Sequence, residues 1–214
     1  LLTRINPFVL NNAVKRFLGF NHYLAWPHAL VLPEPTFASL SIKKEWWSRR
    51  IVVAVEKRNR YAIWCGEQVE AREGNKEEGT TVSEICFWID DIDGVFFERA
   101  PQASGQLIPV VRERVMLTPK LGDIFLPPLQ FGYARKIIAF LRTVDIPVEE
   151  LRFERAFEEL RARTPRNTAV LFSVHEDPEP WAFAALRAFL AKRRIGAYSY
   201  LDLTVRNKIF AQPR

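Results

Sequence analysis

The sequence predicts an α+β fold, with a small α/β unit at the N-terminus followed by a larger, mixed and mostly antiparallel β domain that carries two helices. Three observations support this prediction. Short strand-like runs succeed one another from Asn59 onward. Apolar residues recur at helical spacing in 133–144 and 183–190. A charged stretch, Glu56–Arg58, separates the two parts. We therefore expect a domain boundary between residues 58 and 59.

The N-terminal unit, residues 1–58, is predicted to begin with helices and to end with strands. One helix starts near Asn6, and a shorter one falls within Asn21–Leu32. Two strands follow, Phe37–Lys43 and Arg49–Lys57. In the second strand apolar residues occupy consecutive positions, so we expect both of its faces to be buried.

The β domain, residues 59–214, opens with a clear hairpin. Its strands are Ile85–Ile89 and Val95–Glu98, and the turn between them ends in Asp93-Gly94. Asp-Gly pairs tolerate the positive φ angles of tight hairpin turns. Two further strand candidates follow, at Leu107–Val111 and Val115–Leu117.

The two predicted helices of this domain each precede a strand. Val148–Phe153 follows the first helix, and Tyr198–Leu203 follows the second. Asp177 stands before Pro178, where it can cap the second helix, and Gly196 is placed to end that helix. The apolar runs 157–162 and 169–174 lie between the two helices.

The final segment, Tyr200–Phe210, consists of two short β pieces broken by a polar turn at Arg206-Asn207. A short polar tail then leads to Arg214. Because no following sequence is available to cover this hairpin, we expect a strand with free N–H and C=O groups. Such an edge is either blunted by charge or used to add a partner's strand.

The two cysteines, Cys65 and Cys86, lie in strand-like runs that a polar loop connects. If the runs pair antiparallel, the thiols can face one another and form a disulfide in an oxidising compartment. Two buried, reduced cysteines are the equal alternative. The scattered histidines do not combine with them at the spacing of a metal site.

No pattern in the chain indicates catalysis, so we do not expect an enzyme and expect no cofactor. Asp90, Asp91 and Asp93 lack the further ligands of a calcium loop and are read as a solvated turn. His175 stands beside Glu176 and Asp177, but neighbours in sequence rarely face one another across a site. Glycine-rich phosphate loops and nucleophile elbows are missing from the sequence.

The chain is basic, with a formal net charge of +6, which favours anionic surfaces. Cationic patches occur at Lys43-Lys44, Arg49-Arg50 and Lys192–Arg194, and Trp46 and Trp47 stand between the first two. Aromatic residues among cations also suggest single-stranded nucleic acid. We prefer a basic turn whose tryptophans pack inward, and expect no nucleic-acid partner.

No apolar run is long enough to span a bilayer. The sequence begins at Leu1 rather than at a methionine, so we expect it to be part of a longer protein with an N-terminal anchor.

Several segments in order resemble the extracytoplasmic part of the FtsQ/DivIB bacterial cell-division family. Pro35–Trp46 and Arg50–Arg58 are similar to the end of its POTRA domain. Ala62–Cys65 and Cys86–Phe97 resemble the hairpin that opens its β domain. Tyr200–Phe210 is similar to its terminal strand pair, which begins Tyr-Ile-Asp-Leu.

The resemblance implies a POTRA domain at 1–58 and a β domain at 59–214 with a C-terminal edge strand. It also implies a non-enzymatic, single-pass protein of the cytoplasmic membrane, with this region outside the cytoplasm at the division septum. Its partners would be FtsB/FtsL-type divisome proteins, with FtsW/FtsI and FtsK as further candidates. In that role it would help to coordinate septal wall synthesis.

By the same resemblance, partner binding is expected along the terminal strand pair, at Tyr200, Asp202, Thr204, Val205, Asn207, Ile209 and Phe210. The family has an Arg-Tyr pair where this chain has Thr204-Val205. Recognition is therefore expected to depend on main-chain pairing more than on an aromatic anchor at that point. The alternative is a POTRA-containing module of an outer-membrane assembly or secretion system.

Overall fold

The computed structural model describes residues 34–214, except 46, 49, 70–81, 104–107 and 145. The chain separates into two units, Leu1–Arg58 and Asn59–Arg214, and each is described by itself. The helices predicted near Asn6 and within Asn21–Leu32 lie outside the described residues.

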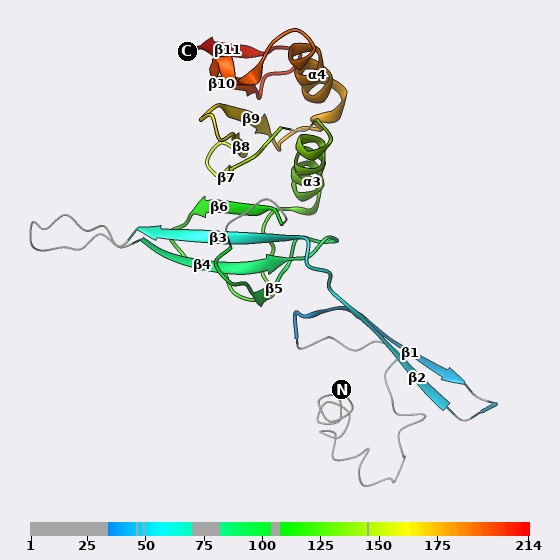
Figure 1. Ribbon diagram of the computed structural model, residues 1–214. Helices are drawn as coiled ribbons and strands as arrows, with labels where there is room; N and C mark the ends of the chain where they lie inside the picture. The colour runs from blue at the N-terminus through cyan, green and yellow to red at the C-terminus, as the bar shows by residue number, and fades with distance from the viewer. Residues whose placement is uncertain (1–33, 46, 49, 70–81, 104–107, 145) are drawn as a thin grey trace, which may run out of the picture. The chain divides into compact units, whose positions relative to one another are not determined.

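The described part of the first unit is an antiparallel pair of strands, β1 (Phe37–Glu45) and β2 (Arg50–Lys57) (Figure 1). Both strands were predicted. The prediction that both faces of the second strand are buried is wrong for the side chains that are described, because Val52 is 43% exposed and Ala54 is also exposed. Among the described residues of this unit, no further strand or helix accompanies the pair, and the pair alone does not define a POTRA-like domain.

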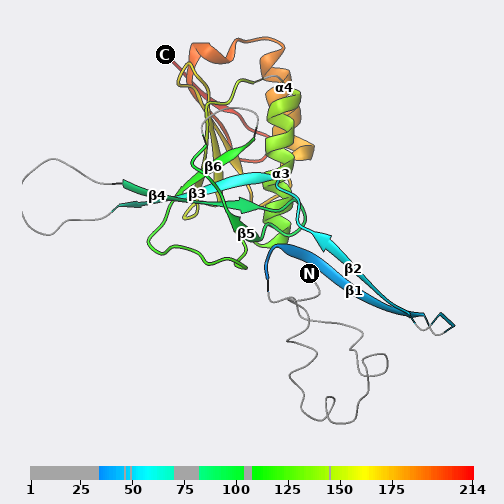
Figure 2. The same ribbon diagram turned by 60° about the horizontal axis from the view of Figure 1, so that its bottom comes forward.

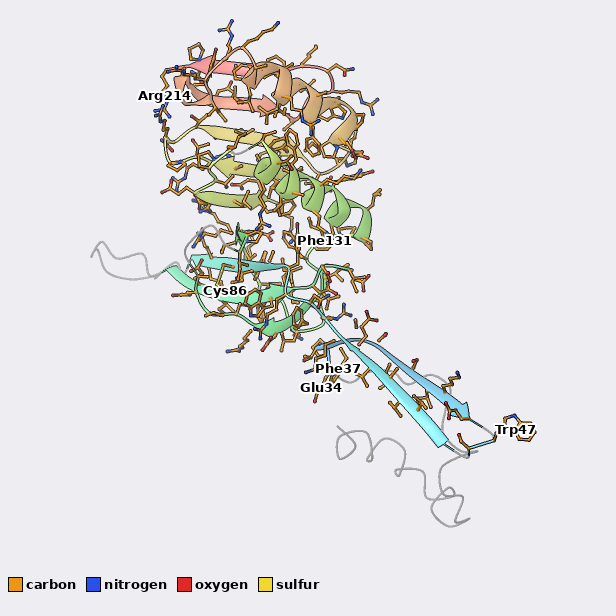
Figure 3. All side chains as sticks on the ribbon, turned by 45° about the vertical axis from the view of Figure 1, so that its right-hand side comes forward. Glu34, Phe37, Trp47, Cys86, Phe131 and Arg214 are labelled. Carbon is orange, nitrogen blue, oxygen red and sulfur yellow. A yellow bond between two sulfur atoms is a disulfide. The ribbon has the colours of Figure 1, made fainter. Side chains whose placement is uncertain are left out.

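Trp47 stands at the turn between β1 and β2, and its side chain is fully exposed (Figure 3). The prediction that the tryptophans of this basic turn pack inward is therefore wrong for Trp47, while Trp46 lies outside the described residues. Within the described part of this unit, the turn has no second layer beneath it that could bury an indole ring.

The second unit is built on a nine-stranded mixed sheet with the order β11-β10-β9-β8-β7-β6-β3-β4-β5. Its pairs are antiparallel except β3 with β6, β6 with β7, and β9 with β10, which confirms the predicted mixed and mostly antiparallel character. The strands are β3 (Ala62–Val69), β4 (Val82–Ile89), β5 (Phe96–Arg99), β6 (Val110–Arg114), β7 (Glu150–Glu154), β8 (Glu159–Arg163), β9 (Ala169–Ser173), β10 (Tyr198–Leu203) and β11 (Phe210–Pro213).

Two helices cover one face of this sheet (Figure 2). The first is α3 (Pro128–Thr143), which has a proline at its first position, where no N–H partner is needed. The second is α4 (Ala184–Leu190), which continues from a wider π-helical turn, Glu179–Phe183. Both helices were predicted; α3 begins several residues before Tyr133, the first residue of the predicted spacing, and the second segment begins next to Asp177 and Pro178 as expected.

The ends of the second helix were predicted with mixed success. The N-cap residue is Pro178, but the Asp177 carboxylate accepts a hydrogen bond from the Glu179 N–H at 3.1 Å, so Asp177 does bind the first N–H of the segment. Gly196 does not end the helix, because α4 stops at Leu190 and Gly196 belongs to a short 3-10 turn, Ile195–Ala197. The run of charged side chains after α4 supplies no apolar face that would prolong it.

The core lies between the sheet and the two helices. Phe140 of α3 stacks on Phe183 with ring centroids 4.0 Å apart, and Phe172 of β9 meets the edge of Phe183. Leu201 and Leu203 of β10 are completely buried against this layer. Because strand side chains alternate, their neighbours Tyr200 and Asp202 project from the opposite face of the sheet.

The predicted β4–β5 hairpin is present, with Gly94 at a φ of +72° in its turn. The predicted strand Val115–Leu117 is not present in the structure. The sixth strand ends at Arg114, and the side chains of Met116 and Leu117 are 99% and 85% exposed. A β-branched and apolar run resembles a strand in sequence, but here the pairing with β3 stops after the Val115 N–H, which donates to the Glu67 carbonyl at 3.1 Å.

Candidate partner-binding edge

The C-terminal hairpin supplies one edge of the nine-stranded sheet. The inner strand β10 pairs with β9 on one side and with β11 on the other. Its main chain is therefore occupied along Tyr200–Leu203. The free edge is β11, Phe210–Pro213, whose four side chains are all exposed.

The main-chain groups of β11 alternate between β10 and solvent. The Arg214 N–H donates to the Ala197 carbonyl at 3.2 Å, and the Gln212 carbonyl accepts from the Ser199 hydroxyl at 3.1 Å. The main-chain groups of the even-numbered residues thus face β10, so the main-chain groups of Ala211 and Pro213 face outward. Pro213 has no N–H, which leaves the Ala211 N–H as the outward donor of β11.

The opposite edge of the sheet, β5, is partly closed by the chain itself. The Phe96 N–H donates to the Asp123 carbonyl at 2.9 Å, and the Phe96 carbonyl accepts from the Gly122 N–H at 2.7 Å. A bridge between Val95 and Ile124 extends this cover. The two edges therefore differ, because residues 122–124 satisfy main-chain groups of β5 whereas β11 has no such cover among the described residues.

Apolar side chains line the uncovered face of the sheet beside this edge. Tyr200 is 37% and Phe210 is 46% exposed. Phe210 is paired with Asp202, and Asp202 with Leu171 of β9, so these side chains share one face. An added strand could place its own apolar residues next to Phe210 and Tyr200.

The predicted site residues fall into three groups. Tyr200 and Asp202 lie on the inner strand β10 and can contribute side chains but no free ladder groups. Thr204, Val205 and Asn207 form the connecting turn, in which Asn207 adopts a φ of +60°. In this turn Thr204 donates from its N–H and its hydroxyl to the Asp202 carboxylate, at 2.8 and 2.6 Å.

The third group is at the edge itself, where Phe210 opens β11 and the half-buried Ile209 packs against the core. Sequence reasoning missed Ala211, Gln212 and Pro213, which were read as a polar tail. The segment Phe-Ala-Gln-Pro has little alternation and ends in proline, so it carries almost no strand signal. The free edge was predicted at Tyr200–Phe210, and the structure has it at Phe210–Pro213.

Electrostatics differ between the turn and the rest of the edge. Burial, followed by the nearby Asp202 carboxylate, raises the pKa of the Glu159 carboxyl on β8. Glu176 pairs with Arg206 of the turn at 3.0 Å. Charges of both signs therefore lie near the turn that leads into β11.

Cys65 and Cys86 are direct partners in the β3–β4 register and are joined by a disulfide, with Cα atoms 4.1 Å apart. Of the two states that the sequence left open, the structure has the bonded one. The Glu84 carboxylate lies with these sulfurs in a group less than 4.8 Å across. Both sulfurs are bonded to each other and Glu84 pairs with Arg112 at 3.1 Å, so this group does not offer free ligands.

The other residues considered for chemistry are held apart or serve a turn. His175 contacts Glu158 at 2.9 Å, whereas Asp177 pairs with Lys136 at 2.7 Å. The Asp90 carboxylate accepts from the N–H groups of Asp93 and Val95 inside the β4–β5 turn. His175 and Asp177 therefore have different partners, and Asp90 stabilises its own turn.

Within the described part of the chain, no helix combines the length and the apolar character needed to cross a bilayer. In comparisons with protein-family models and with characterised proteins, the chain matches none.

Proposed function

We propose that this chain is the extracytoplasmic part of a divisome scaffold of the FtsQ/DivIB type, which recruits FtsB/FtsL-type partners by adding a partner strand to β11. The observation that carries the proposal is the free edge at Phe210–Pro213, where the Ala211 N–H and C=O point outward. Strand addition uses main-chain groups of this kind and takes its specificity from adjacent side chains.

Two further observations support the proposal. The Cys65–Cys86 disulfide suits an oxidising compartment outside the cytoplasm. The sequence segments that resemble the family run in the family's order along the chain. On this proposal the protein is a membrane-anchored, non-enzymatic component of the septum that helps to coordinate wall synthesis.

The test removes the outward donor and leaves the hairpin intact. Ala211→Pro deletes the Ala211 N–H, whereas the β10–β11 bonds are made by the even-numbered residues. Binding of the FtsB- and FtsL-type proteins of the same genome would be measured by biolayer interferometry. We expect at least a tenfold loss of affinity, the order of one main-chain hydrogen bond and the strand contacts that depend on it.

Met116→Pro is the matched control, because Met116 is 99% exposed and follows β6, several strands away from β11 in the sheet. It should bind like the unmodified chain. Thermal unfolding of all three proteins establishes that the fold persists. Unchanged binding by a folded Ala211→Pro variant would exclude β11 as the recruiting edge.

A further inference from the structure

One end of β11 lies among cationic side chains. The Arg214 N–H and side chain donate to the carbonyls of Ala197 and Tyr198, each at 3.2 Å, and the guanidinium also reaches the Arg166 carbonyl. Arg193 donates to the Tyr198 hydroxyl at 2.9 Å. These contacts bring the β8–β9 turn and the segment after α4 to the end of β11, which Figure 3 marks by Arg214. We call this the basic end, which consists of Arg166, Lys192, Arg193, Arg194 and Arg214.

The basic end has little negative charge to offset it. Neither residues 160–175 nor residues 180–201 contain Asp or Glu. Among the described residues, no carboxylate forms an ion pair with Arg166, Lys192 or Arg194, and all three side chains belong to exposed residues. These three cations therefore face solvent next to a free strand edge, beside Arg193 and Arg214, whose side chains are hydrogen-bonded.

The other end of β11 is different. There Arg206 is paired with Glu176, and the carboxylates of Asp202 and Glu159 lie close to each other. Lys208 is the cation that remains at this turn without a carboxylate partner among the described residues. Unpaired positive charge along the edge is therefore greatest beside Pro213.

We infer that the strand that pairs with β11 carries Asp or Glu residues at the end that lies beside the basic end. This inference rests on the proposed strand addition and names the chemistry of the partner. Because β11 offers few outward main-chain groups, side-chain contacts must contribute much of the affinity and specificity. Opposite charges that meet across an interface accelerate association and disfavour wrong partners.

Lys208 acts against a second copy of this chain as the occupant. Antiparallel pairing of two β11 strands would place the basic end of one copy beside the turn of the other, where Lys208 lies and Arg206 is already paired with Glu176. Exposed edges are commonly protected from self-pairing by such cations.

The experiment uses the full chain and four fluorescein-labelled peptides. Each peptide has a core of alternating Thr and Val, and a Glu pair or a Lys pair at its N-terminus or its C-terminus. Binding is followed by fluorescence anisotropy at low and high ionic strength. We expect one Glu peptide to bind about tenfold more tightly than its Lys counterpart, a preference that should shrink in high salt. The position of the preferred Glu pair reports the direction of the added strand.

Two double variants with the same change in net charge separate a local effect from a global one. Lys192→Glu/Arg194→Glu alters the basic end, and it should abolish or reverse the preference. Arg114→Glu/Lys120→Glu alters exposed residues at and after the end of β6, several strands away in the sheet, and it should retain the preference. Equal loss in both variants would overturn the inference, since net charge alone would then explain the result.

The remaining outcomes distinguish this inference from the proposed function. Tight binding of Glu and Lys peptides alike overturns the acidic preference and leaves strand addition standing. A Glu peptide that binds equally well with proline in its core overturns strand addition and the inference together. Sedimentation velocity that shows the unmodified chain as a dimer dissociated by Ala211→Pro would make a second copy the occupant and overturn the inference.

Discussion

Arg155 donates hydrogen bonds from Nε and Nη2 to the two carboxylate oxygens of Glu113, at 2.5 and 3.0 Å. Glu113 is 1% exposed, and its Oε2 also accepts from the Trp64 indole N–H at 2.8 Å. A buried carboxylate of β6 is thus held by a guanidinium from the β7–β8 turn and by a core tryptophan of β3. The group ties together strands that are distant in sequence.

Replacement of Arg155 by Met should destabilise the β domain by about 3 kcal/mol, because a buried carboxylate loses its counter-charge. For a domain of this size the melting temperature should fall by roughly 9 °C. Arg114→Met, at the exposed end of β6, is the control and should change stability by less than about 0.5 kcal/mol. Similar melting temperatures for the two variants would show that the Glu113 carboxylate is satisfied without Arg155.

The disulfide should contribute to stability mainly by constraining the unfolded chain. Cys65 and Cys86 are separated by 21 residues in sequence, and closing a loop of that length is worth about 3 kcal/mol. The Cys65→Ala/Cys86→Ala variant should therefore unfold at lower urea concentration. Adding reductant should shift the unmodified chain toward the variant and leave the variant unchanged, and an effect of reductant on both would point to another cause.

Gly94→Ala should destabilise the β domain by about 2 kcal/mol, because the residue has a positive φ. A methyl group there would also lie 2.9 Å from the Phe131 ring, which belongs to the core. Gly132→Ala is the matched control with the opposite expected sign, since a Cβ at this position of α3 has no neighbouring atom within 4 Å outside its own helix backbone. Alanine favours helix, so that variant should gain about 0.5–1 kcal/mol. Chemical denaturation of the two variants measures the change in the free energy of unfolding, which should be negative for Gly94→Ala and positive for Gly132→Ala.

The contact between Lys136 and Asp177 should make stability depend on acid pH. Burial acts to raise the pKa of Asp177, but hydrogen bonds from Lys136 and from the Glu179 N–H outweigh it and leave this pKa below its ordinary value. A lowered folded-state pKa gives stability that is present above about pH 4 and lost as the pH falls below it. Asp177→Asn should therefore lose less stability than the unmodified chain between about pH 5 and pH 3, as urea titrations at each pH would show.

Local sequence signals predicted much of this fold, and long-range pairing explains what they missed. Asp93-Gly94 marked the β4–β5 turn because few residues tolerate its φ, and the helical spacing after Tyr133 marked α3. By contrast, β11 is a strand because β10 lies beside it, and Val115–Leu117 is not one because the pairing with β3 stops after Val115 and the side chains of Met116 and Leu117 stay exposed. Tertiary pairing overrides local preference in both directions.

The candidate site was harder to predict for the same reason. The sequence indicated the terminal hairpin, but the order of strands in the sheet decides which of its two halves is free. The basic end also could not be predicted, since Arg166 and Lys192–Arg194 are joined through hydrogen bonds made by Arg214 and Arg193. Such proximity depends on the crossover that places β10 parallel to β9.

Pro213 has a consequence for how a partner would find its register. A strand that slides along β11 by two residues meets an imide nitrogen instead of the Ala211 N–H, and its carbonyl then has no donor. A change of register along a uniform strand edge costs little free energy. Along β11 the registers differ in free energy, because only one of the two outward residues has an N–H. The main chain of β11 would thus favour one register of the bound strand, independently of the side chains of that strand.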